Sequence, residues 1–197
     1  TRRVIQIVPA LEVTEGAGVS VYRSIGTPAR RNLDPFLMLD QFSTYEPDDY
    51  IAGFPDHPHR GFNTFTYMLD GHMRHGDSMG NSGDLGPGGA QWMKAGSGVI
   101  HSEMPQQESG RMRGFQLWIN LPAAQKMTAP EYQDISPQAI PEVNVDDATV
   151  RVIAGEFEGR QGPVTDAHTN FHFLDVALEP GVHFVHAVPA YETVFIY

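Results

Sequence analysis

The chain has 197 residues, of which 41% are hydrophobic, and its 24 Asp and Glu outnumber its 13 Lys and Arg. This apolar fraction is typical of a globular protein and excludes a mainly disordered chain. The net charge of −11 argues against direct binding of DNA or RNA, because nucleic-acid-binding surfaces are basic. The lack of cysteine excludes disulfide scaffolds and cysteine-based zinc sites.

Short alternating segments separated by Gly and Pro predict an all-β protein, and helical periodicity is scarce. Strands of this kind, with turns at short intervals, are typical of sandwiches and barrels. The predicted strands cover residues 62–69, 89–95, 99–104, 113–121, 150–157, 171–178, 182–188 and 193–197.

A boundary between two β units is expected after Leu121. Residues 122–146 hold four prolines (122, 130, 137 and 141) and show little periodicity, which predicts an ordered linker. The second unit contains too few predicted strands to close a barrel.

The apolar runs of the sequence and its first residues predict where in the cell the protein lies. The sequence has no run of about 18 apolar residues, so no transmembrane helix is predicted. The first residues, TRRVIQIVPA, lack the apolar stretch of a signal peptide. We therefore expect a cytoplasmic protein with no membrane partner.

Two pairs of residues have the spacing of metal ligands. His57 and His59 are two apart, as are His101 and Glu103, and in an extended strand such residues share one face. If the two strands are neighbours, four ligands converge, and imidazole with carboxylate suits Fe, Mn, Zn, Ni or Cu. One His-x-His pair is often a surface accident, but two such pairs in one β-rich chain favour a metal site.

The other histidines are given structural or exposed roles. His72 and His75 flank a turn and are expected to face solvent. The remaining four are scattered over the second unit: His168, His172, His183 and His186.

Several motifs, in order, resemble the pirin family, a branch of the cupin superfamily. The resemblance covers residues 2–135 densely and is weak beyond them. The motifs are EGAG at 15–18, LDPFLMLDQF at 33–42, HPHRGF at 57–62, HGDSMG at 75–80, QWMKAGSGVIHSEM at 91–104 and QLWINLP at 116–122.

The resemblance implies two tandem cupin barrels. The first, over residues 1–127, would bind one metal ion, usually Fe(II), through His57, His59, His101 and Glu103. Residues 128–197 would form the linker and the first strands of a second barrel without metal. Because pirin-like chains run longer, this second barrel is expected to be truncated. Thr64 stands where many cupins have a ligand glutamate, which fits the pirin branch.

The first functional hypothesis that follows from the resemblance is that the protein is an enzyme. Some pirins resemble quercetin 2,3-dioxygenases, which open a flavonol ring with O2, so the partners would be a small aromatic substrate and O2. Glu103 could serve as general base at the metal. Arg60 could act beside the ligands. Four apolar side chains are candidate pocket walls: Phe42, Phe54, Met104 and Phe115.

Two other functions stay open. The protein could be a metal- and redox-sensing regulator that binds a transcription factor or a metabolic enzyme, with its acidic charge suited to a basic protein surface. It could also be a metal-binding cupin acting on an unrelated small molecule, because this fold hosts many chemistries.

Overall fold

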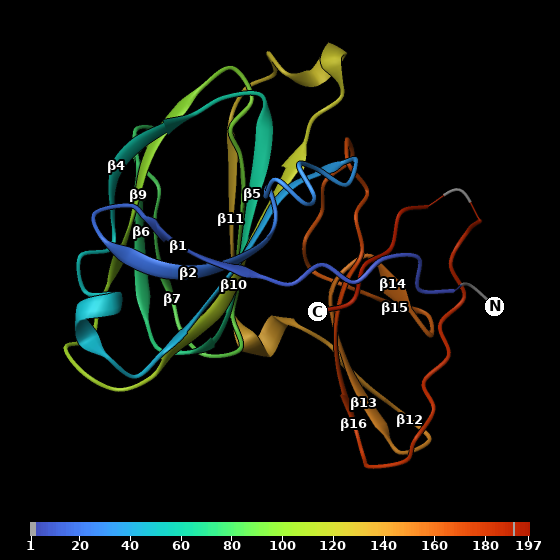
Figure 1. The fold of residues 1–197 in the computed structure, drawn as a ribbon. Coiled ribbons are helices and arrows are strands. Elements are labelled where there is room, and N and C mark those ends of the chain that lie inside the picture. The colour runs from blue at the N-terminus through green and yellow to red at the C-terminus, as the bar shows by residue number, and fades with distance from the viewer. Residues whose placement is uncertain (1–2, 191) are drawn as a thin grey trace.

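The computed structural model describes residues 3–190 and 192–197, and the fold is nearly all β (Figure 1). Two antiparallel sheets face each other in a barrel, and a smaller β unit lies beside it. This confirms the all-β cupin architecture. Within the described residues, no helix is long and apolar enough to cross a bilayer.

The larger sheet has seven strands in the order β1-β2-β3-β10-β5-β8-β11. The smaller sheet has four, in the order β4-β9-β6-β7. The larger sheet comprises β1 (Leu11–Glu15), β2 (Val19–Ile25), β3 (Phe36–Thr44), β5 (Phe62–Asp70), β8 (Ala90–Lys94), β10 (Met112–Asn120) and β11 (Glu131–Ile135). The smaller sheet comprises β4 (Phe54–His59), β6 (Met73–Asp77), β7 (Ser82–Leu85) and β9 (Val99–Pro105).

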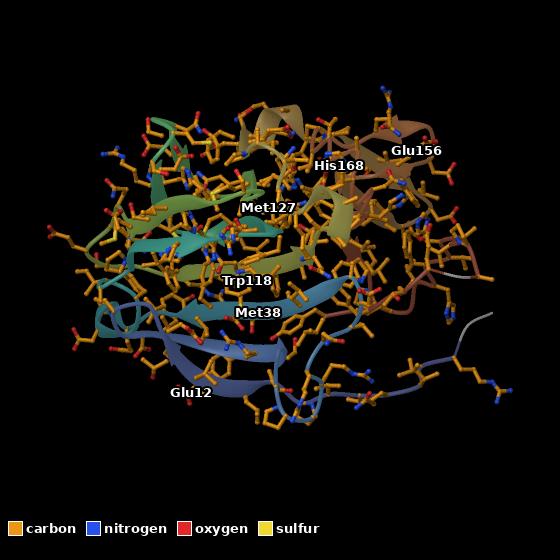
Figure 2. The ribbon with its side chains drawn as sticks, turned by 90° about the horizontal axis from the view of Figure 1, so that it is seen from above. Glu12, Met38, Trp118, Met127, Glu156 and His168 are labelled. Carbon is orange, nitrogen blue, oxygen red and sulfur yellow. The ribbon has the colours of Figure 1, made fainter. Side chains whose placement is uncertain are left out.

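The second unit holds a three-stranded sheet in the order β12-β13-β16 and a two-stranded ribbon of β14 and β15. Figure 2 shows Glu156 and His168 in this unit, away from Met38 and Trp118 on the neighbouring strands β3 and β10. The strands of the second unit are β12 (Glu142–Val145), β13 (Ala148–Ala154), β14 (Glu156–Phe157), β15 (Arg160–Gln161) and β16 (Phe173–Leu178). Among the described residues, three short 3-10 helices also form: η1 (Pro47–Asp49), η2 (Ala123–Gln125) and η3 (Pro137–Ala139).

Strand alternation divides the core into two main parts. Along β10, Leu117 and Ile119 pack with Phe65 and with Ile153 of the second unit. Inside the barrel, a separate cluster forms around Phe42, together with Val19, Val21, Tyr50, Met68, Met73, Leu85 and Met112. The period-two apolar stripe of β10 therefore joins the barrel to the second unit, and the opposite face of that strand is left for the barrel interior.

Two sequence predictions differ from the structure. The segment predicted as a linker contains β11 and β12, and β11 extends the larger sheet by pairing with β8. Residues 182–188 and 193–197, predicted as strands, form none. An apolar alternating segment becomes a strand only where a neighbour supplies a hydrogen-bonded ladder. The division at residues 127 and 128 stays a prediction.

A polar contact also fastens the two units. The Tyr67 hydroxyl on β5 donates to Oδ2 of Asp175 at 2.7 Å, and Nη1 of Arg151 donates to the Tyr67 oxygen at 2.6 Å. Burial, reinforced by Asp175, raises the pKa of Tyr67, so the hydroxyl stays protonated and can donate.

Replacing Tyr67 by Phe removes a buried donor and acceptor and leaves both partners without this bridge. We expect Tyr67→Phe to lower the free energy of unfolding by about 1–3 kcal/mol, measured by urea denaturation. Tyr45→Phe, at a side chain that is 66% exposed, is the matched control and should change it little. Equal stabilities of the two variants would contradict this role for Tyr67.

Candidate metal centre

Three imidazoles meet where β4 and β9 pair in antiparallel register. His57 lies opposite His101, and His59 follows His57 on the same face of β4. The ring centroids lie 4.6 Å apart for His57 and His59, 4.4 Å for His57 and His101, and 4.8 Å for His59 and His101. One ring nitrogen from each of the three lies within 4.8 Å of the others, so the cluster could hold a metal ion.

The hydrogen bonds of these rings leave nitrogen lone pairs for a metal. Nδ1 of His57 lies 2.7 Å from the Pro55 carbonyl oxygen, which can only accept, so this ring carries its proton on Nδ1 and Nε2 is free. Nε2 of His59 and Nε2 of His101 are buried without a hydrogen-bond partner among the described residues. Buried polar atoms are normally partnered, so this unpartnered set fits a cation of the kind that imidazole binds.

The same burial keeps two of the rings neutral. Burial, and after it the neighbouring imidazoles, lowers the pKa of His59 and the pKa of His101 to about 3. Neutral imidazole is the form that coordinates metals. At neutral pH these two rings are therefore ready to act as ligands without losing a proton.

Glu103 follows His101 by two residues on β9 and faces the same side, but its carboxylate lies outside the group of three imidazoles. The carboxylate is buried, with 3% of the residue exposed. Its Oε1 accepts a hydrogen bond from Oγ1 of Thr66 at 3.0 Å, and its Oε2 accepts one from Nε2 of Gln116 at 2.6 Å. Each oxygen has a second lone pair, so these contacts orient the carboxylate and leave it able to bind a further group.

A small recess of about 10 Å³, with room for about one water molecule, adjoins Glu103. Phe42 and Phe54, two of the four side chains chosen as pocket walls, line it. Its other lining residues are Val21, Asp40, Thr66, Met73 and Gln116. Polar and apolar side chains therefore share its lining, and a ligand larger than water enters only if these side chains move apart.

The other predicted pocket residues lie elsewhere. Met104 follows Glu103 and Phe115 precedes Gln116, and both of these neighbours face the recess. Strand alternation therefore turns Met104 and Phe115 to the opposite face. Phe115 instead contacts the ring of Tyr197, with centroids 5.0 Å apart. Arg60 is exposed just beyond the end of β4.

Sequence reasoning missed two buried polar groups. Asp40, in the recess, is paired with Arg23 through Nε–Oδ1 and Nη2–Oδ2 contacts of 2.7 and 2.6 Å. Burial raises the pKa of Asp40 against the lowering effect of Arg23. The expectation for His75 was wrong: it is 2% exposed and its Nδ1 lies 3.4 Å from Nδ1 of His101. The spacing of His75 and Asp77, again two apart, was the available signal.

The fold and the site define a cupin-type β-barrel protein with a histidine cluster suited to a metal ion. The chain matches the Pirin family over residues 18–119. It is 52% identical over 185 residues to a pirin-like protein of Caulobacter vibrioides, covering 93% of this chain and 67% of that protein. The chain belongs to the pirin family.

Solved structures agree with this assignment. A crystal structure of a Geobacillus kaustophilus protein matches with a TM-score of 0.79 and 33% identity, over 91% of this chain and 70% of that one. The crystal structure of a quercetin 2,3-dioxygenase from Acinetobacter baumannii matches with a TM-score of 0.72 and 36% identity, over 81% of this chain and 58% of that one.

The lowered pKa values predict how the metal-free protein responds to acid. Between pH 6.5 and about 3 the unfolded chain binds protons at His59 and His101 that the folded chain does not. The unfolded state is therefore favoured as the pH falls, by up to about 1.4 kcal/mol per pH unit for each imidazole. Urea denaturation from pH 7 to 5 measures this loss.

The double variant His59→Phe/His101→Phe lacks both imidazoles, so its free energy of unfolding should fall less between pH 7 and 5 than that of the wild type. An equally steep loss in this variant would show that other groups cause the acid sensitivity.

Proposed function

We propose that this pirin-family protein is an Fe(II)-dependent dioxygenase that opens flavonols such as quercetin with O2. His57, His59, His101 and Glu103 would hold the metal. The observation that supports this most is the convergence of three imidazole nitrogens beside a buried carboxylate and a recess. The named activity of the Acinetobacter baumannii relative, which has the same fold, favours this substrate class.

An open-shell metal bound there would supply activation of O2 and of the flavonol oxygens. The protein's own groups would do the rest. Glu103, held by Thr66 and Gln116, would accept the proton of the flavonol 3-hydroxyl as general base. Phe42 and Phe54, which line the small recess, would move apart to admit the aromatic rings, then pack against them and exclude water. In the overall reaction both atoms of O2 enter the product and carbon monoxide leaves.

The test uses protein loaded anaerobically with Fe(II), quercetin, and O2 added to start the reaction. We expect the flavonol absorbance to fall with wild-type protein. His101→Ala should lower both the bound iron, measured by elemental analysis, and the rate, because it removes a buried ligand. His72→Ala, at an exposed histidine, is the control and should retain both.

Turnover that is unchanged in His101→Ala would contradict the proposed site. Iron-loaded wild-type protein that turns over none of a panel of flavonols would contradict the substrate class. In that second case the metal site remains, and binding to a protein partner that depends on the iron oxidation state becomes the function to test.

A further inference from the structure

A chain of three side chains runs from the histidine cluster into the smaller sheet. Nδ1 of His101 lies 3.4 Å from Nδ1 of His75, and Nε2 of His75 lies 3.2 Å from Oδ2 of Asp77. His75 and Asp77 are on β6, which pairs with β9 so that Asp77 lies opposite His101. Neither residue has a part in the proposed reaction.

The contacts of Asp77 fix the direction of the hydrogen bonds in this chain. Its Oδ1 accepts from the backbone N–H groups of Met79 and Asn81, at 2.9 and 3.0 Å. Its Oδ2 accepts from Nδ2 of Asn81 at 2.9 Å. These neighbours are all donors, so a protonated Asp77 carboxyl group would find no acceptor among them for its hydrogen. Asp77 therefore accepts from His75, and His75 carries a proton on Nε2.

A neutral His75 with its proton on Nε2 has a lone pair on Nδ1. That lone pair can only accept, so the hydrogen in the His75–His101 contact belongs to Nδ1 of His101. His101 then has a lone pair on Nε2, the buried atom with no partner among the described residues. A proton at that atom would be unsatisfied, whereas a lone pair there can bind a metal ion.

We propose that Asp77 and His75 are positioning residues that set the tautomer of His101 and so prepare its Nε2 to bind metal. This inference rests on the proposed metal site. A carboxylate behind a histidine ligand is a common way to orient it, and here a second histidine extends the connection. The relay would act before any metal arrives, because it is built entirely from side chains of the protein.

Packing holds the middle member of the relay in place. The His75 ring stacks on Tyr132 of β11, with centroids 4.3 Å apart and planes 11° from parallel. His75 is 2% exposed, so its ring is enclosed on its other sides as well. Through Tyr132, strand β11 thus contacts His75, and His75 in turn contacts His101 of the metal centre.

Asp77→Asn is the sharpest test because it reverses the relay with little change of shape. The new amide must keep its carbonyl oxygen where Oδ1 receives two backbone N–H groups. Its NH2 then takes the place of Oδ2: one N–H donates to Nε2 of His75, and the Asn81 side-chain amide turns so that its oxygen accepts the other. That ring would carry its proton on Nδ1 and donate to His101, which moves the His101 proton onto Nε2, where it blocks the metal.

The tautomer is read in metal-free protein at neutral pH from long-range 1H–15N couplings of the imidazoles. We expect the proton of His101 on Nδ1 in the wild type and on Nε2 in Asp77→Asn. In parallel, Co²⁺ affinity is measured by competition with a chelating dye. It should fall about 10–100-fold in Asp77→Asn, the range typical for loss of such partners.

Asp84→Asn is the matched control. Asp84 lies on β7 of the same sheet and pairs with Arg74 at 2.8 Å, with both side chains about half exposed. This variant should leave the tautomer and the Co²⁺ affinity unchanged. His75→Phe keeps an aromatic ring against Tyr132 but removes the acceptor, so it should also weaken Co²⁺ binding, and it serves if Asp77→Asn does not fold.

A wild-type His101 with its proton on Nε2 would overturn the proposal, and so would a charged His75 with protons on both nitrogens. An Asp77→Asn variant with wild-type tautomer and affinity would also overturn it. A merely structural role would change stability without moving the tautomer. Failure of the metal site is a separate result: wild-type protein that binds no Co²⁺ would contradict the proposed function, whereas the tautomer is measured without metal.

Discussion

The antiparallel pairing of β4 with β9 is the constraint on which the candidate site depends. This register places His57 opposite His101 and lets alternation bring His59 to the same face. Burying His59 and His101 has a cost, because lack of solvent and the neighbouring imidazoles disfavour their charged forms.

Each sheet contributes a different part of the site. The smaller sheet provides the histidines and Glu103, and the larger sheet provides Thr66 and Gln116, which hold the Glu103 carboxylate. The contact therefore joins the two walls of the barrel at the site. The apolar stripe of β10 faces the second unit, where Leu117 and Ile119 pack, so Gln116, which precedes Leu117, points inward. One strand thus supports both the interdomain core and the site.

Much of this was accessible from the sequence. The spacing predicted that His57 shares a face with His59, and His101 with Glu103, because side chains two apart in a strand share a face whatever the rest of the fold does. That the two pairs meet depends on the pairing of β4 with β9, which the spacing left as a condition. The same rule could not choose pocket walls: Phe42 and Phe54 line the recess, whereas Met104 and Phe115 are turned away by their position next to Glu103 and Gln116. The alternation of side chains along a strand tells which residues share a face, but only the neighbouring strands decide which face points into the barrel.

The sequence by itself determined the all-β class, the family and the two pairs of candidate ligands, since these rest on local alternation and on motifs contiguous along the chain. The tertiary structure alone decided the roles of Asp40, His75 and Tyr132. His75 looked like a residue beside an exposed turn, yet it is buried because β6 pairs with β9 and β11 brings Tyr132 against its ring. Such environments depend on contacts between strands distant in sequence, and no local pattern records which strand will become the neighbour.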